Sequence, residues 1–253
     1  MNLAINTKKL IERISKNREN QDFSLEDWIF ADLDLERYKN ILELCSGTGL
    51  QSEYIIKNAG IGAKIILSDI SKESTDILKQ KFGKKNEIKI INQDIDKLLD
   101  SLKETFDLIF VSYGLYYSKY AEHILCGKIA RLIKPGGRFT VVGPYRGNNS
   151  EFFGYLSSLG IQIPRPVIHC CEEFMENILH EMAPFSSKIR INFVENVQKW
   201  NSWESLLAYW QNSTFHDARR EEILKKNIKI YFDNNSYFQV TKKISKFEIT
   251  LKG

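Results

Sequence analysis

The sequence has little of several features that define other classes of protein. Its 253 residues include only four cysteines, at positions 45, 126, 170 and 171, and their spacing forms no disulfide framework. No apolar run approaches the roughly 20 residues needed to cross a bilayer. The first nine residues also lack a charged-then-apolar signal pattern. We therefore expect a soluble cytoplasmic protein with reduced thiols and no membrane partner.

The chain also lacks a strong excess of charge of either sign. Its 36 basic and 32 acidic residues leave a formal charge of +4, which gives only a weak attraction to anions. This balance favours no nucleic-acid partner. Hydrophobic residues make up 43% of the chain, so a sizeable core can be buried.

From residue 40 onward, short apolar runs alternate with amphipathic stretches. The runs lie at 41–44, 64–67, 88–91, 106–111 and 138–142, and the helix-like stretches lie near 50–59, 72–82, 95–102 and 119–133. Alternation of this kind predicts a parallel sheet with helices on both faces and right-handed crossovers.

The segments that flank this alternation have different patterns. Residues 1–38 form an N-terminal segment that we expect to be helical over 8–37, with Ser24 as an N-cap. Residues 144–235 are longer than a simple crossover and carry helical stretches with one strand-like run at 189–194. We interpret 144–235 as a helical insert that forms a lid on the substrate side of a single domain spanning 1–253.

The end of the chain returns to a strand pattern. Two runs, 237–241 and 247–251, are separated by only five residues, which favours an antiparallel hairpin. The predicted fold is α/β: a Rossmann-like, doubly wound, seven-stranded sheet that ends in an antiparallel C-terminal hairpin. The N-terminal helical segment and the helical insert after the fifth strand are additions to it.

A pair of glycines stands where the first strand meets the first helix. The strand at 41–44 is followed by Gly47-Thr48-Gly49, and a helical pattern starts at once. Glycines allow a sharp turn and let a ligand approach the backbone closely. Taken alone, such a pair is as typical of a plain tight turn as of a nucleotide site.

Carboxylates at the ends of the next two strands favour the nucleotide site. Asp69 lies twenty residues after Gly49, where it can accept hydrogen bonds from the ribose hydroxyls of an adenosine. Asp94 can accept from an adenine amino group, with Ile95 packing on the ring. Each aspartate can instead cap a helix, but Ser71 can serve as the cap after Asp69 and leave that carboxylate free. Ligands in open α/β sheets bind at these strand ends, so the succession favours binding.

Two residues distinguish between the nucleotides that such a site could bind. A dinucleotide site needs a third glycine near position 52, where this chain has Ser52. Glu43 stands just before the turn, where it is a poor neighbour for a diphosphate and a good one for the ammonium of a methionine moiety. Both residues favour S-adenosylmethionine (SAM) over NAD.

The stretch Glu43-Leu-Cys-Ser-Gly-Thr-Gly49 resembles the E/D-x-G-x-G-x-G loop of class I SAM-dependent methyltransferases, of the small-molecule type. The run Leu132–Phe139 is similar to the family's "LKPGG" turn, and the end hairpin is also a family mark. The first loop glycine is replaced by Cys45, which we do not expect to act as a nucleophile because it lies in the cofactor loop. The resemblance implies SAM as cofactor, bound by Glu43, Cys45, Gly47, Gly49, Asp69, Ile70, Asp94, Ile95, Ser112 and Tyr113.

The segment after the fourth strand bears on the acceptor. The family's DNA amino-methylating members have Asn/Asp-Pro-Pro-Tyr here, and this chain does not. Leu115-Tyr116-Tyr117 resembles the "LYH" stretch of small-molecule enzymes, with a tyrosine in place of the histidine that can act as a base. The candidate catalytic residues are Tyr113, Tyr116 and Tyr117, together with His169 and His216 of the insert. Tyr145 and Arg146 are further candidate contacts to the substrate.

The resemblance implies methyl transfer to a small-molecule acceptor with a nitrogen or oxygen nucleophile. The reaction is an in-line displacement in which the protein mainly aligns donor and acceptor. Two alternatives remain open, a SAM-using non-methylating transferase or cyclase and a non-catalytic SAM-binding protein. His169-Cys170-Cys171 lacks a second ligand pair at suitable spacing, so we predict no metal site. A homodimer stays compatible with the sequence.

Overall fold

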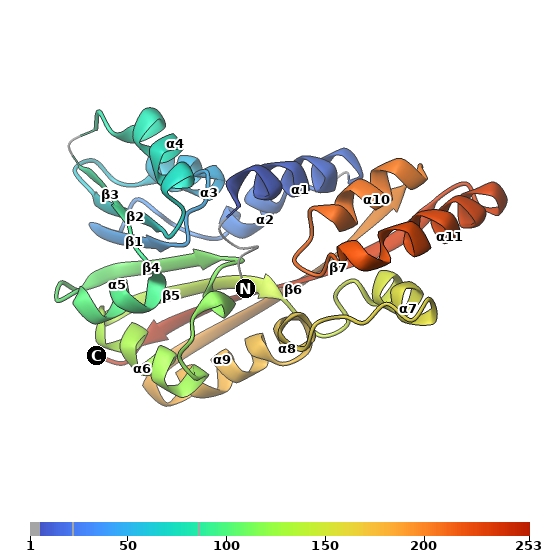
Figure 1. Ribbon diagram of the computed structural model, residues 1–253. Coiled ribbons are helices and arrows are strands. Elements are labelled where there is room, and N and C mark those ends of the chain that lie inside the picture. Colours follow the sequence, from blue (N-terminus) through green and yellow to red (C-terminus); the bar gives the residue numbers. More distant parts are fainter. Residues whose placement is uncertain (1–5, 22, 86) are drawn as a thin grey trace. The chain divides into compact units, whose positions relative to one another are not determined.

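The computed structural model describes all residues except 1–5, 22 and 86. Across the described residues the strands form one seven-stranded sheet in the order β3-β2-β1-β4-β5-β7-β6 (Figure 1). The strands are β1 (Asn40–Leu44), β2 (Lys64–Asp69), β3 (Ile88–Asn92), β4 (Phe106–Ser112), β5 (Ile133–Pro144), β6 (Ser186–Trp200) and β7 (Phe238–Leu251). The predicted α/β fold class is confirmed.

The central strands are parallel and apolar. β1 pairs in parallel with β2 and with β4, while β3 extends the pairing from β2 and β5 from β4. Residues 41–44 are all buried, as expected for parallel strands with both faces covered. Parallel pairing brings the carboxyl ends of β1, β2, β3 and β4 to one edge of the sheet, which is where the predicted ligand groups occur.

The crossover helices lie close to their predicted bounds. They are α3 (Leu50–Asn58), α4 (Lys72–Phe82), α5 (Ile95–Ser101) and α6 (Glu122–Arg131). Figure 1 shows α3 and α4 on one face of the sheet, and α5 and α6 with α9 (Phe174–Met182) on the other. This layering is the doubly wound arrangement that the alternating sequence pattern predicts.

The chain divides into two compact units. The sheet unit comprises residues 24–143, 174–193 and 245–253, and the insert unit comprises the described parts of 1–23, 144–173 and 194–244. The insert unit contains α1 (Thr7–Glu19), α7 (Ser150–Ser158), α8 (Arg165–Glu172), α10 (Trp203–Gln211) and α11 (Glu221–Asn234). Trp200, Trp210 and Phe152 are fully buried in a core of its own. That 1–253 functions as a single domain with a lid stays a prediction.

The N-terminal segment is less helical than predicted. Residues 8–37 hold two helices, α1 and α2 (Leu25–Phe30), and the expected N-cap of α2 is confirmed because Ser24 Oγ accepts from the Asp27 amide at 3.2 Å. After α2 the buried side chains alternate with exposed ones, with Leu33 and Leu35 inside. Alternation is the pattern of an extended chain, so this stretch does not continue the helix.

The antiparallel end of the sheet is built from a different pair of segments than predicted. Residues 238–251 form one continuous strand, β7, between β5 and β6, so Lys242–Lys246 is not a turn. Lys242 and Lys246, the first and last residues of this segment, are instead part of the strand and have polar partners there. Lys246 Nζ donates to the carbonyls of Trp28 (3.4 Å) and Ile29 (3.0 Å) at the end of α2. Hydrogen bonds of this kind offset the cost of burying the Lys246 ammonium. The polarity of the sequence alone predicts a loop at this position.

Candidate functional site

The glycine loop at the end of β1 has an unusual backbone. Cys45, Gly47 and Gly49 all have left-handed φ angles, of 56°, 54° and 87°. A Cβ added at Gly49 would lie 2.7 Å from Leu78 Cδ2 on α4, so this position needs glycine for both its φ and its contact. The loop therefore turns sharply into the N-terminus of α3 and presents backbone there.

Cys45 is accommodated by a glycine on the neighbouring strand end. A Cβ added at Gly114 would lie 2.2 Å from Cys45 Cβ. Tyr113, just before it, also has a left-handed φ of 53°. A non-glycine residue in this conformation costs about 1–2 kcal/mol, and such strain concentrates at functional sites. Cys45 and Tyr113 are two such residues, and they lie at the adjacent ends of β1 and β4. Their backbone conformations therefore indicate a functional site at this edge of the sheet, independently of any family resemblance.

The Cys45 thiol is not a nucleophile in this setting. Burial raises its pKa well above the usual range, and the carboxylates of Asp69 and Asp94 raise it further. The thiolate is the reactive form of cysteine, so the side chain acts as a packing group against Gly114. This agrees with the interpretation made from its place in the loop.

Two serines tie the loop to β2. The Ser46 amide donates to the Ser68 carbonyl at 2.8 Å, and the Ser68 amide donates to Ser46 Oγ at 3.2 Å. Ser68 Oγ also donates to the carbonyl of Glu43 at 3.1 Å. These positioning bonds were not predicted, because nothing in the spacing of two serines 22 residues apart indicates that they meet.

Glu43 is buried beneath the loop. Only 2% of it is exposed, and Ser52 Oγ donates to its Oε2 at 2.6 Å. Burial raises the pKa of Glu43 to about 8, with Ser52 opposing the shift and the charge of Asp69 adding to it. The serine at the position of the missing third glycine therefore orients the carboxyl group that the sequence assigns to the methionine ammonium.

Asp69 holds the loop as well as facing the site. Its Oδ2 accepts from the Gly47 amide and its Oδ1 from the Ser71 amide, both at 2.8 Å. Ser71 does cap α4, accepting from the Ser74 amide at 3.3 Å, but the expectation that this leaves Asp69 free is wrong. Each carboxylate oxygen keeps further acceptor capacity, so ribose binding stays a prediction. Burial raises the pKa of Asp69, and the hydrogen bonds from the Ser71 and Gly47 amides lower it by less.

The third strand end presents the groups predicted for adenine. Asp94 caps α5 through Oδ1, which accepts from the Asp96 amide at 3.0 Å, so the capping alternative is realised while Oδ2 can still accept. Ile95 is 7% exposed and belongs to the core, whereas Ile70 is 42% exposed. Ile70 is therefore the better apolar surface for a ring. Asn92 Nδ2 donates to the Ile70 carbonyl at 2.9 Å and orders this turn.

The segment after β4 is fixed by Asp96. Ser118 Oγ donates to Asp96 Oδ1 at 2.5 Å, and the Lys119 amide donates to Oδ2 at 2.9 Å. Between these anchors and β4, the rings of Tyr116 and Tyr117 meet edge to face at 4.7 Å. Ser112, Tyr113, Tyr116 and Tyr117 are all partly exposed. The sheet unit thus gathers every predicted cofactor residue and three candidate catalytic tyrosines at one edge.

The two candidate histidines belong to the insert unit. His169 Nδ1 lies 3.0 Å from Glu173 Oε2, and His216 Nε2 lies 3.2 Å from Glu221 Oε2. Each ring is held and oriented by its own glutamate. Their catalytic roles, and the substrate contacts proposed for Tyr145 and Arg146, stay predictions.

Lys242 is a buried titratable group that the sequence pattern did not predict. Its Nζ donates to Asn149 Oδ1 at 2.6 Å and to the Tyr209 hydroxyl. Burial lowers its pKa to about 7, while Cys171 and Glu151 raise it and Arg13 lowers it. A lysine inside a run of polar residues is typical of a solvent-exposed surface. The burial of Lys242 follows only from the packing of the insert unit.

Metal-ligating side chains do not cluster in the part of the chain that the structure describes. No group of three or more His, Cys, Asp or Glu residues there is arranged to hold an ion. Likewise, none of the described helices is long and apolar enough to cross a membrane.

Comparison with known proteins agrees with this geometry. Residues 41–137 match the family model described as a methyltransferase domain. The ubiquinone/menaquinone biosynthesis C-methyltransferase of Francisella tularensis subsp. novicida is 32% identical over 152 residues, which cover 59% of this chain and 53% of that protein. The chain thus spans about half the length of the curated relatives it matches.

Solved structures share the fold at low sequence identity. A phosphoethanolamine N-methyltransferase of Haemonchus contortus, in complex with S-adenosylhomocysteine, has a TM-score of 0.58 at 15% identity, covering 98% of this chain and 58% of that one. Geranyl diphosphate C-methyltransferase from Streptomyces coelicolor has a TM-score of 0.51 at 12% identity, covering 89% and 74%. Together these comparisons show that residues 41–137 are similar to methyltransferase domains and that the chain shares its fold with solved methyltransferases.

The residues present fit SAM, the cofactor that the sequence resemblance implies. Three left-handed loop residues expose backbone at the head of α3, and a buried carboxyl group lies directly beneath them at Glu43. Asp69 and Asp94 follow at the next two strand ends, each with acceptor capacity left. A cationic methionine end, a ribose and an adenine require groups of these kinds in this order.

Glu43 predicts that SAM binding is linked to a proton. With a pKa of about 8, the carboxyl is about 90% protonated at pH 7, whereas an ammonium neighbour stabilises the carboxylate. We expect binding at pH 7 to release close to one proton and binding at pH 9 to release almost none. Calorimetric titration in phosphate and in Tris, whose ionisation enthalpies differ, measures that number.

The variant Glu43→Gln serves as the control, because its amide still accepts from Ser52 and has no proton to release. Its SAM affinity should fall about tenfold or more. Its stability should no longer decline between about pH 4.5 and 8, the range in which the raised pKa of Glu43 makes the wild type lose stability. If the wild type and Glu43→Gln released the same number of protons on binding SAM, Glu43 would not be the group that contacts the methionine ammonium.

Lys242 predicts a second pH dependence, confined to stability. The unfolded chain keeps this proton up to about pH 10.5, whereas the folded chain loses it above about pH 7. Stability should therefore rise with pH between these values, by up to about 1.4 kcal/mol per pH unit. Urea unfolding from pH 6 to 9.5 should show a shallower rise in Lys242→Met than in the wild type. Lys243→Met, whose amine pairs with Glu195 at 3.1 Å, is the matched control and should keep the wild-type slope.

Proposed function

We propose that the protein transfers the methyl group of SAM to a small-molecule acceptor through a nitrogen or oxygen nucleophile. The observation that carries this proposal is the edge where Glu43, Asp69 and Asp94 stand at successive strand ends around a left-handed loop. The partly exposed Tyr113, Tyr116 and Tyr117 lie next to that loop, at the end of β4. Donor-binding and acceptor-orienting groups are thus adjacent within one unit.

SAM supplies an already activated methyl group when bound, so the protein's own contribution is alignment. Glu43 orients the methionine end, and Asp69 fixes the ribose against the loop that it already anchors. The tyrosines orient the acceptor by hydrogen bonds and ring contacts, because a phenol with a pKa of about 10 is a poor base at neutral pH. An acceptor with a nucleophilic atom of its own therefore suits this edge best.

Methylation of carbon is the second candidate. The Francisella relative is named as a C-methyltransferase, and the geranyl diphosphate enzyme with the same fold is too. A carbon nucleophile generally needs a base or an electron-rich ring to form it. The amine of Lys242 and the imidazoles of His169 and His216 are the groups of the insert unit suited to that task.

Two measurements test the proposal. Calorimetry should show binding of SAM and of S-adenosylhomocysteine, and absence of binding would contradict the main conclusion. Incubation with methyl-labelled SAM and pools of amines, phenols and carboxylic acids should move label to a small product with equimolar S-adenosylhomocysteine. Release of methylthioadenosine instead indicates a non-methylating transferase. Binding without turnover of any pool indicates a non-catalytic SAM-binding protein.

A further inference from the structure

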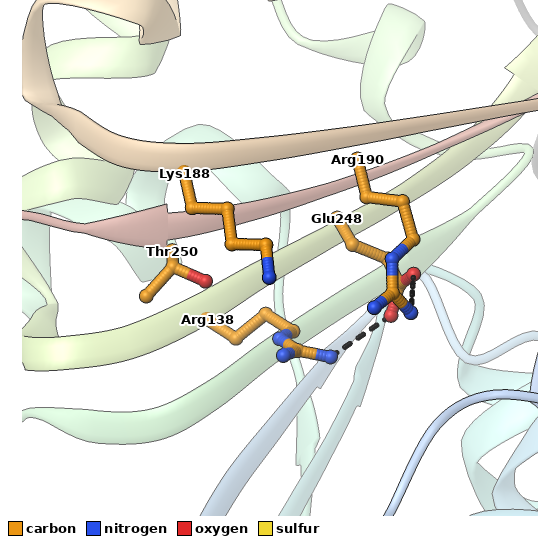
Figure 2. Close-up of a pocket in the computed structure, with 5 residues that line it drawn as sticks. All are labelled: Arg138, Lys188, Arg190, Glu248 and Thr250. Atoms are coloured by element: carbon orange, nitrogen blue, oxygen red, sulfur yellow. Dashed lines mark hydrogen bonds and ion pairs between the residues drawn. The ribbon is translucent and has the colours of Figure 1, made fainter.

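Lys246 of β7 is a buried cation of the sheet unit that forms no ion pair with the described residues. Only 2% of it is exposed. Glu248, two positions along the same strand, already has other partners. Figure 2 shows its carboxylate joined to Arg138, at 2.9 Å, and to Arg190, at 3.4 Å. Taking an ammonium out of water without an ion pair is costly, and hydrogen bonds to neutral groups offset that cost only in part. Stability alone therefore does not account for a lysine at this position.

The partners of Lys246 are two carbonyls in the last turn of α2. Its Nζ donates to the carbonyls of Trp28, at 3.4 Å, and Ile29, at 3.0 Å, and lies 5.3 Å from the centre of the Trp28 ring. The last carbonyls of a helix have no partner within the helix and carry partial negative charge. A lysine that donates to them fixes the end of the helix. Lys246 thus fastens α2 to β7.

The other side of α2 is fastened to the first two turns of α3. Gln51 Nε2 donates to Glu26 Oε1 at 3.4 Å. One turn further along α3, the Tyr54 hydroxyl donates to Asp27, and the Tyr54 ring stacks on Phe30 with 4.9 Å between the ring centroids. The short helix α2 is therefore a bridge between β7 and α3.

The part of α3 that α2 contacts supports the cofactor edge. Gln51 stands two residues after Gly49 of the glycine loop. The next residue, Ser52, donates to the buried carboxyl group of Glu43 at 2.6 Å. A displacement of this turn therefore reaches both the loop and the carboxyl group that SAM binding is expected to use.

From these contacts we propose that Lys246 is a positioning residue for SAM binding, which acts by holding α2 against the first turns of α3. The role rests on the proposed function and extends it to a residue that acts through another element. A buried charge that breaks the usual rules of core packing is expected where function requires it. Support of this kind keeps the groups that contact a ligand in a productive geometry.

Calorimetric titration with SAM tests the bridge from both of its sides. Lys246→Met keeps the length of the side chain, removes the two hydrogen bonds to α2 and should raise the Kd for SAM about tenfold. Tyr54→Phe removes the hydroxyl bond to Asp27 from a partly exposed position and should raise the Kd as well. The double variant should be little weaker than Lys246→Met, because both changes release the same helix.

Lys252→Met is the matched control for these variants. The Lys252 amine also donates to a carbonyl, that of Pro184, at 2.7 Å, but it is exposed and lies beyond the end of β7. This variant should bind SAM with wild-type affinity. It separates the loss of a lysine from the loss of the attachment to α2.

Hydrogen exchange of the ligand-free protein gives a readout that does not depend on SAM. The amides of Trp28 in α2 and of Glu53 in the first turn of α3 form backbone hydrogen bonds of 3.2 and 3.0 Å. Both should exchange faster in Lys246→Met than in the wild type. The Leu98 amide of α5, with a bond of 2.9 Å, should keep its wild-type rate.

Several results would overturn the role of Lys246. Faster exchange at Leu98 as well as at Glu53 makes the lysine a general stabilising residue, and an unchanged rate at Glu53 shows that α2 does not order the turn. Fully additive losses of SAM affinity in the double variant show that Lys246 and Tyr54 do not act through the same helix. Equal SAM affinity in Lys246→Met and the wild type contradicts this role alone, whereas a wild type that binds no SAM contradicts the proposed function.

Discussion

Replacing Asp69 by alanine is expected to weaken SAM binding about a hundredfold. A carboxylate that accepts two ribose hydroxyls forms charge-assisted bonds worth about 1.5–3 kcal/mol each, and a loss of about 3 kcal/mol is two powers of ten in Kd. The variant also removes the acceptors for the Gly47 and Ser71 amides, so the loop itself loses two anchors. Calorimetric titration with SAM measures the affinity.

The controls for Asp69 separate ligand binding from folding. Asp76→Ala removes an aspartate that is partly exposed on α4 and forms its ion pairs with lysines, and the SAM affinity of this variant should equal that of the wild type. Asp69→Asn keeps one carbonyl oxygen as an acceptor and should lie between wild type and alanine. If Asp69→Ala binds SAM with wild-type affinity while its melting temperature falls, the aspartate is only a loop anchor and the ribose assignment is wrong.

Gly114→Ala should destabilise the protein by about 3 kcal/mol, and Cys45→Gly should rescue it. The alanine Cβ would lie 2.2 Å from Cys45 Cβ, an overlap that forces backbone shifts in a packed region. The φ of Gly114 is −133°, which alanine tolerates, so the contact is the whole cause. Urea unfolding of both single variants and the double variant gives the coupling, which should exceed about 2 kcal/mol.

Gly127→Ala is the matched comparison for this cycle. Gly127 lies inside α6, and a Cβ there would meet nothing within 4 Å. Alanine should therefore stabilise the helix by up to about 1 kcal/mol. Cys45→Gly alone should be close to neutral, because relief of left-handed strain is offset by the freedom glycine adds to the unfolded chain. Additive effects of Gly114→Ala and Cys45→Gly would show that the two side chains do not compete for space.

The cofactor edge was predictable because its signals are local. A strand that is apolar on both faces, two glycines and a following helix specify the turn at 47–49, and parallel pairing then brings Asp69 and Asp94 to the same edge. Ser71 as the cap of α4 follows from the same short-range chemistry. The bonds from Ser52 to Glu43 and from Ser118 to Asp96 were not predictable, because they join side chains whose meeting depends on how helices pack on the sheet.

The sequence by itself determined the alternating α/β pattern, the class of cofactor and the strand ends predicted to bind it, since periodicity and turn chemistry act over a few residues. Only the tertiary structure decided that Lys242–Lys246 continue a strand, because the groups that satisfy Lys242 and Lys246 come from residues more than 30 positions away. It also decided the direction in which the pKa of each buried group shifts, upward for Glu43 and downward for Lys242, because distant segments bury both side chains.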